Sequence, residues 1–133
     1  MISKSKSGLI LGMFLLSAFV LSATSNGAWM EKVPQKDRDK TNPYGTQADA
    51  IAAGQRIFHD HCAHCHGSDA EGTKKRPSLR TERVQQQASE GDLHWLLVNG
   101  DKSGMPTWSK LGDPQIWQVI TYVRSLKVEQ APK

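Results

Sequence analysis

Three residues near the middle of the chain combine two thiols and an imidazole at a fixed spacing. Cys62, Cys65 and His66 form the pattern C-x-x-C-H, and the chain contains no other cysteine. This pattern is typical of the covalent attachment of a c-type haem. Two thiols on one helical turn can each add to a vinyl group on the same edge of the porphyrin, and the next side chain then lies beneath the iron. The sequence therefore predicts one covalent haem c, bound through Cys62 and Cys65, with His66 as the proximal iron ligand.

A second axial ligand is predicted in a turn 39 residues beyond His66. The candidates are His59, His61, His94 and Met105. Met105 lies between a glycine and a proline in a polar turn, whereas a methionine that only fills a core normally lies on an apolar face. A thioether opposite a histidine is a common ligand pair of haem iron. We therefore predict Met105 as the distal ligand, and we expect no separate catalytic residue.

The first 28 residues have the pattern of an export signal. Lys4 and Lys6 precede an uncharged apolar run of 16 residues, Gly8–Ala23. This run is shorter than the roughly 20 apolar residues of a membrane-spanning helix, which favours a cleaved signal over a retained anchor. We expect the protein in the periplasm, or on the outer face of the inner membrane if the signal is retained.

The rest of the chain divides into three parts. Residues 29–45 are polar and contain two prolines, so we expect a linker or a strap over the surface. Residues 46–128 are expected to form the haem domain, and residues 129–133 a tail. This length fits one small domain, and we expect a monomer.

The charge balance argues against nucleic acid as a partner. The formal net charge is +4, but residues 1–28 contain two lysines and no acidic residue, so their removal leaves +2. The two propionates of a haem would bring this value close to zero. Nucleic-acid-binding domains are usually far more basic.

Hydrophobic periodicity predicts an all-α domain with three main helices. The first is expected to have Thr46 as its N-cap and to end at the cysteine motif. The second is expected to have Ser89 as its N-cap, with Asp92 at the third helical position, and to end near Gly100. Loops at 67–80 and 101–112 connect the helices and are expected to carry functional side chains.

The third helix is expected to have Asp113 as its N-cap and Pro114 at its first position. Apolar residues at helical spacing predict a broad buried face on this helix. Its polar, solvent-facing stripe is expected to consist of Gln118, Thr121 and Ser125.

Four motifs occur in the order that a known family shows: Gly54-x-x-x-Phe58-x-x-x-Cys62-x-x-Cys65-His66, Arg76-Pro77-Ser78-Leu79, Gly104-Met105-Pro106-Thr107-Trp108, and a closing helix Trp117–Leu126 with Tyr122. Together they resemble a monohaem class I cytochrome c, over about Thr46–Leu126. The chain is especially similar to the small bacterial cytochromes c that accompany periplasmic dehydrogenases. The resemblance implies three main helices and loops wrapped around one covalent haem.

The resemblance implies the same thioethers and axial ligands as the spacing does. It also implies that Pro77 accepts a hydrogen bond from the other ring nitrogen of His66, which orients the ring. In the family pattern, the first and last helices cross. This crossing would bring together Gly54, Phe58, Val119 and Tyr122.

The remaining histidines are expected not to bind the iron. His59 and His61 are expected to face solvent, and His64 to point away from the iron. His94 is expected at the surface or at its boundary. An adventitious metal site among the histidines near the cysteine motif is left open.

The basic run Lys74–Arg76 has two interpretations: a solvated loop, or a charged rim that steers an acidic partner. Arg80 and Arg83 are candidates for contact with a propionate. Trp108 is expected to lie against the haem.

These features favour an electron carrier whose partners are redox proteins: a donor dehydrogenase, and an acceptor oxidase or another cytochrome. One alternative is a haem enzyme or gas sensor with a labile sixth ligand. A second is a haem-free module in which the cysteines bind zinc or form a redox disulfide, although structural zinc sites usually need four protein ligands.

Overall fold

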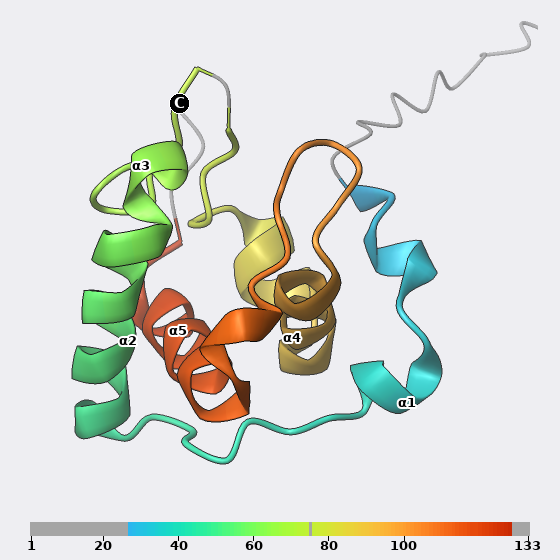
Figure 1. The fold of residues 1–133 in the computed structure, drawn as a ribbon, viewed down its shortest axis with the longest axis horizontal. Coiled ribbons are helices and arrows are strands. Elements are labelled where there is room, and N and C mark those ends of the chain that lie inside the picture. The colour runs from blue at the N-terminus through green and yellow to red at the C-terminus, as the bar shows by residue number, and fades with distance from the viewer. Residues whose placement is uncertain (1–26, 75, 129–133) are drawn as a thin grey trace, which may run out of the picture.

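The computed structural model describes residues 27–74 and 76–128 (Figure 1). Its frame consists of three helices, α2 (Ala48–His61), α4 (Glu90–Asn99) and α5 (Asp113–Ser125). Shorter helical segments are η2 (Met30–Lys32), α1 (Gln35–Arg38), α3 (Ala63–His66), the π-helix η3 (Arg83–Gln87) and η4 (Ser109–Leu111). The described residues contain no strand, only an isolated bridge between Asp101 and Met105. The predicted all-α class with three main helices is confirmed.

The expected export signal and the tail at 129–133 lie outside the described residues, apart from positions 27 and 28. Within the part of the chain that is described, no helix is both long and apolar enough to cross a membrane.

Helices α2 and α5 cross in close contact, as the resemblance predicts. A Cβ atom at Gly54 would lie only 1.9 Å from the backbone oxygen of Gln118 and 3.0 Å from the Cβ atom of Tyr122. The glycine therefore lets the two backbones approach. One turn farther along α2, the ring of the fully buried Phe58 lies 5.3 Å from the ring of Tyr122. The crossing fixes the end of α2 that carries the cysteine motif.

The predicted N-cap of α4, Ser89, is confirmed, and this residue forms a capping box with Asp92. The backbone N–H of Asp92 donates to the Ser89 hydroxyl oxygen (3.0 Å), and the Ser89 N–H donates to the Asp92 carboxylate (2.8 Å). Gly100 is the C-cap of this helix and has a φ of +70°, a conformation that glycine adopts without steric cost. Both predicted ends of the helix are therefore correct.

Two predicted caps are wrong by one residue. The N-cap of α2 is Gln47 and not Thr46, because the first intrahelical bond runs from the Ile51 N–H to the Gln47 oxygen. The N-cap of α5 is Gly112 and not Asp113. The Asp113 carboxylate instead contacts a histidine of α4.

The segment expected as a linker or strap, residues 29–45, contains η2 and α1 and then runs without further helix toward α2 (Figure 1). It is anchored on α4, where the Arg38 Nε atom lies 3.3 Å from the Asp92 carboxylate and the Ser89 hydroxyl donates to the Arg38 oxygen (3.0 Å). It is anchored on α5 by Asn42, whose side-chain amide donates to the Thr121 hydroxyl (2.9 Å). Thr121 is therefore buried, 1% exposed, and its prediction as part of the polar stripe is wrong.

Candidate haem-binding cavity

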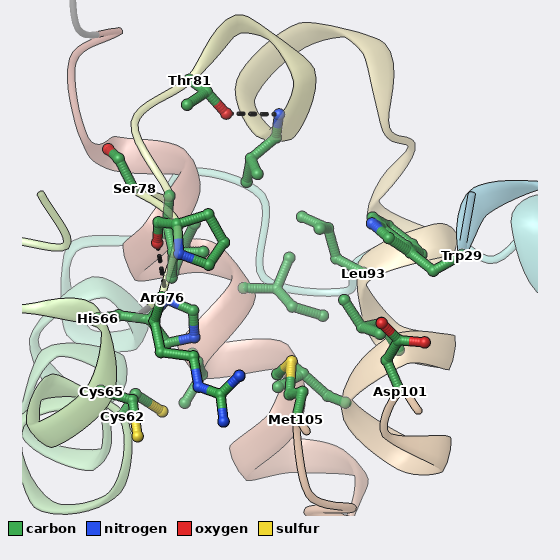
Figure 2. A pocket seen from close by; sticks show the side chains of 18 of the residues that line it. Trp29, Cys62, Cys65, His66, Arg76, Ser78, Thr81, Leu93, Asp101 and Met105 are labelled. Carbon is green, nitrogen blue, oxygen red and sulfur yellow. Dashed lines mark hydrogen bonds between the residues drawn. The ribbon is translucent and has the colours of Figure 1, made fainter. Parts of the chain in front are cut away.

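A largely apolar cavity of about 730 Å³ lies among α2, α4, α5 and the loops that connect them. This size lies within the range of small-molecule and cofactor sites. Figure 2 shows the cysteine pair at one end of the cavity, with His66 and Met105 on different sides of it. The apolar lining includes Phe58, Leu79, Leu93, Leu96, Leu97, Trp108, Val119, Ile120 and Val123.

His66 is oriented by the loop that follows it. Its ring lies at the cavity wall and is 9% exposed. The Nδ1 atom lies 3.0 Å from the backbone oxygen of Pro77, as the resemblance predicts. Because the proline oxygen can only accept, Nδ1 carries the proton and Nε2 keeps its lone pair for a metal. Burial lowers the pKa of His66, which favours the neutral imidazole that a metal requires.

The cysteines lie on either side of the turn at the end of α2. Cys62 is buried and is the C-cap of α2, whereas Cys65 is exposed and lies in α3. No disulfide joins them. Burial is the main reason that the pKa of the Cys62 thiol rises to about 11. Both residues line the cavity at the same end, so their thiols are available to one edge of a bound group.

Met105 lies in a loop, residues 101–108, which we call the methionine loop. One end of this loop is attached to α4, because the Trp108 N–H donates to the Leu97 oxygen (2.7 Å) and the Thr107 hydroxyl donates to the Val98 oxygen (2.5 Å). Within the loop, the Asp101 N–H donates to the Met105 oxygen (2.9 Å), so the backbone at Met105 is bound to the start of the loop. These bonds hold the thioether at the cavity.

The other histidines occupy different positions, and one of these positions corrects a prediction. His59 and His64 are exposed. His61 is exposed too, but it lies at the cavity rim, where its ring is 5.5 Å from that of Trp108. His94 is buried (3% exposed) and not at the surface, because its ring stacks on Trp117 with a centroid distance of 4.3 Å. No group of three or more metal-binding side chains occurs among the described residues.

Arg76, Arg80 and Arg83, the candidates for a charged rim or for contact with a propionate, differ in their positions. Arg83 lines the cavity, whereas the Nε atom of Arg80 donates to the backbone oxygen of Lys127 (3.1 Å). Arg76 lines the cavity and donates to the methionine loop. Its position depends on two loops that are distant in sequence, so only a folded structure could reveal it. Trp108 lines the cavity as expected.

The residues present fit a covalently bound haem. The apolar walls suit a large flat macrocycle, and the two thiols lie at one end of the cavity. The imidazole has its Nδ1 atom engaged and its Nε2 atom available, which is the arrangement found in metal-bound histidines. A thioether belongs to the soft donors that haem iron accepts.

The fold is that of the class I c-type cytochromes. The chain is similar to cytochrome cL from Methylophaga aminisulfidivorans MPT, with a TM-score of 0.56 and 29% identity over 64% of this chain and 58% of that one. It also shares its fold with cytochrome cL from Hyphomicrobium denitrificans, with a TM-score of 0.57 and 20% identity over 74% and 66% of the two chains.

A family model described as cytochrome c oxidase, cbb3-type, subunit III matches residues 49–123, and the chain belongs to this family. Its cofactor is accordingly a covalently bound haem c.

Two curated relatives are named as subunits of cbb3-type cytochrome c oxidases. The cbb3-type cytochrome c oxidase subunit FixP of Sinorhizobium medicae (strain WSM419) is 32% identical over 95 residues, which cover 61% of this chain and 29% of the relative. Subunit CcoP of Rubrivivax gelatinosus is 33% identical over 79 residues, covering 58% and 26%. The chain thus spans less than a third of the length of these relatives.

Proposed function

We propose that the protein carries one electron at a time on its haem c, with Cys62 and Cys65 as thioethers, His66 as the proximal ligand and Met105 as the distal ligand. The observation that carries this proposal is the placement of His66 and Met105 at one apolar cavity, with the His66 Nδ1 atom bound to Pro77. When bound, the haem supplies an iron that alternates between two oxidation states, and His/Met ligation favours the reduced one.

The chain's own residues keep the site rigid and dry. Pro77 fixes the tautomer and the orientation of His66. The attachment of the methionine loop to α4 fixes the position of Met105. The apolar side chains around the cavity exclude water. A site with both axial positions filled leaves no open coordination position for a substrate, and for this reason we propose a carrier and not an enzyme.

The proposed partners are redox proteins, a dehydrogenase-type donor and a respiratory acceptor. The names of the curated relatives, which are subunits of cytochrome c oxidases, support an oxidase or another cytochrome as the acceptor. We propose that the protein acts in the periplasm, either free after loss of residues 1–28 or anchored through them. No part of the proposal involves nucleic acid, and we propose a monomer.

Expression with a c-type maturation system tests this function. The proposal predicts covalent haem by the pyridine haemochrome assay, low-spin spectra in both oxidation states, and a reversible one-electron redox titration. Purified candidate dehydrogenases and terminal oxidases then identify the partners by the rates at which they reduce and oxidise the protein.

His64 and His66, on either side of Cys65, provide a matched control. His66→Gln is expected to abolish the low-spin spectrum, whereas His64→Gln, at an exposed position in the same turn, leaves it unchanged. A high-spin ferric wild-type protein that turns over peroxide or binds gases at neutral pH would contradict the carrier and favour the haem enzyme or sensor.

A further inference from the structure

The methionine loop is held by the side chain of Arg76, which lines the same cavity. One guanidinium nitrogen of Arg76 donates to the backbone oxygen of Ser103 (3.0 Å), and the second donates to that of Gly104 (3.2 Å). These oxygens belong to the two residues directly before Met105. Figure 2 shows the guanidinium between His66 and Met105. We call this pair of hydrogen bonds the Arg76 clasp.

The backbone of Arg76 is in turn fixed to the side of the cavity that carries His66. Two backbone bonds join Thr73 and Arg76: the Thr73 N–H donates to the Arg76 oxygen (2.9 Å), and the Arg76 N–H donates to the Thr73 oxygen (3.3 Å). The Thr73 hydroxyl donates to the backbone oxygen of Cys65 (3.0 Å). The next residue, Pro77, binds His66. The clasp therefore joins the segment that orients the proximal histidine to the loop that presents Met105.

Gly104 is shaped to receive the guanidinium. A Cβ atom at this position would lie 2.8 Å from one terminal nitrogen of Arg76 and 3.2 Å from the other. Gly104 also has a φ of +108°, a conformation that residues with side chains rarely adopt. The backbone conformation of Gly104 strongly favours glycine, and a side chain here would also displace the guanidinium of Arg76.

We propose that Arg76 is a positioning residue for the distal ligand, acting through the Ser103 and Gly104 carbonyls to keep the Met105 thioether at the iron. This inference rests on the proposed function, because it takes Met105 as the ligand. The attachments of the methionine loop to α4 follow Met105 in sequence, whereas the clasp holds the residues that precede it. Withdrawal of the thioether from the cavity therefore requires the loop to break the clasp or the α4 attachments.

The chemistry of the side chain suits this role. Guanidinium is planar, permanently charged, and presents a rigid fork of donors that can reach two neighbouring oxygens at once. A lysine would keep the charge but not the fork. The comparison of lysine and glutamine at position 76 therefore separates the clasp from the effect of a positive charge near the iron.

The test measures how fast imidazole replaces Met105 on the ferric haem of the holoprotein, together with the intensity of the methionine–iron charge-transfer band. Arg76→Gln is expected to accelerate imidazole binding about tenfold, since one net hydrogen bond from a charged donor contributes about the free energy of a factor of ten. Arg76→Lys is expected to give most of the same increase. Arg80→Gln removes a charge four positions away, from a side chain that donates to the backbone oxygen of Lys127. Its rate of imidazole binding is expected to equal that of the wild type.

A double-mutant cycle supplies a second readout. Gly104→Ala strains the backbone in any background, but it collides with the guanidinium only when Arg76 is present. Its effect on imidazole binding is therefore expected to be smaller in the Arg76→Gln background. The comparison uses differences between folded variants, so a modest loss of stability in one of them does not affect the conclusion.

Three results overturn the clasp: Arg76→Gln that binds imidazole like the wild type, Arg76→Lys that restores wild-type behaviour through its charge alone, or a Gly104→Ala effect that is equal in both backgrounds. Each of these leaves the proposed function intact if the wild type shows the methionine–iron band. A wild-type protein without that band contradicts the proposed ligand and the clasp together.

Discussion

The Nε2 atom of His94 lies 3.0 Å from the Oδ1 atom of Asp113, so the middle helix α4 is joined to the first residue of α5. The His94 side chain is buried and stacks on Trp117, whereas that of Asp113 is 73% exposed. The packing of the ring thus contributes more to stability than the polar contact, because water screens the exposed partner.

We expect His94→Ala to lower the free energy of unfolding by about 3 kcal/mol, through the loss of a buried, stacked ring. Asp113→Asn is expected to cost less than about 1 kcal/mol, because it changes only a solvent-exposed partner. Urea unfolding of the holoprotein, followed by circular dichroism, measures both. His59→Ala, at an exposed position on α2, serves as the control. Equal losses in His94→Ala and His59→Ala would show that position 94 is not part of the packed interior.

Gly54 is expected to tolerate no side chain. At the exposed position Ala52 of the same helix, replacement by glycine should cost about 1 kcal/mol, the ordinary helix preference. At position 54 glycine is expected to be more stable than alanine, because the alanine Cβ atom would lie 1.9 Å from the backbone oxygen of Gln118. Gly54→Ala should destabilise the protein by about 3 kcal/mol or more, as other overpacked contacts do.

Thermal unfolding of Ala52→Gly and Gly54→Ala tests the crossing of α2 and α5. A Gly54→Ala variant as stable as the wild type would mean that the two helices do not approach as closely as described.

The sequence predicted the parts of the site that depend on local spacing. The residues of the cysteine motif are close to one another in the sequence, and so are Ser89 and Asp92, so each of these two geometries follows from about one turn of helix. The need for Gly54 could also be anticipated, because the resemblance indicated which helices cross. The same resemblance predicted the hydrogen bond between His66 and the Pro77 oxygen.

The features that sequence reasoning missed depend on contacts between distant segments. Thr121 looks polar and solvent-facing along its helix, but Asn42 covers it from 79 positions away. His94 is buried because Trp117 and Asp113 meet it from another helix. The clasp joins Arg76 to carbonyl oxygens 27 and 28 positions on. The acceptors of the clasp are backbone oxygens, which leave no signature in a sequence. The partners of Thr121 and His94 are side chains of distant segments, which the local periodicity of one helix does not indicate.

Asp101 is expected to make the methionine loop sensitive to acid. The Ser103 hydroxyl donates to its carboxylate (2.5 Å), and this bond is the main reason that the pKa of Asp101 is lowered from 3.8. A carboxyl group whose pKa is lower in the folded than in the unfolded chain stabilises the folded state. This stabilisation is complete at any pH above the pKa of the group in the unfolded chain. That stabilisation is lost as the pH falls through the lowered pKa.

We therefore expect Asp101→Asn to weaken the methionine–iron band above about pH 4, where the wild-type carboxylate is ionised. Below the lowered pKa of Asp101 the two proteins should behave alike, because the wild-type group is then neutral too. Acid titration of the band in both proteins is the measurement. A constant difference between the two curves down to the lowest pH would contradict the assignment to Asp101.

The absorption spectrum of the ferric holoprotein at neutral pH tests whether His66 and Met105 together bind the haem iron. We predict a low-spin spectrum with a methionine–iron charge-transfer band. This band should disappear in Met105→Ala and persist in Met30→Ala, which removes a partly buried methionine in η2. A high-spin wild-type spectrum, or a band that survives in Met105→Ala, would contradict the account.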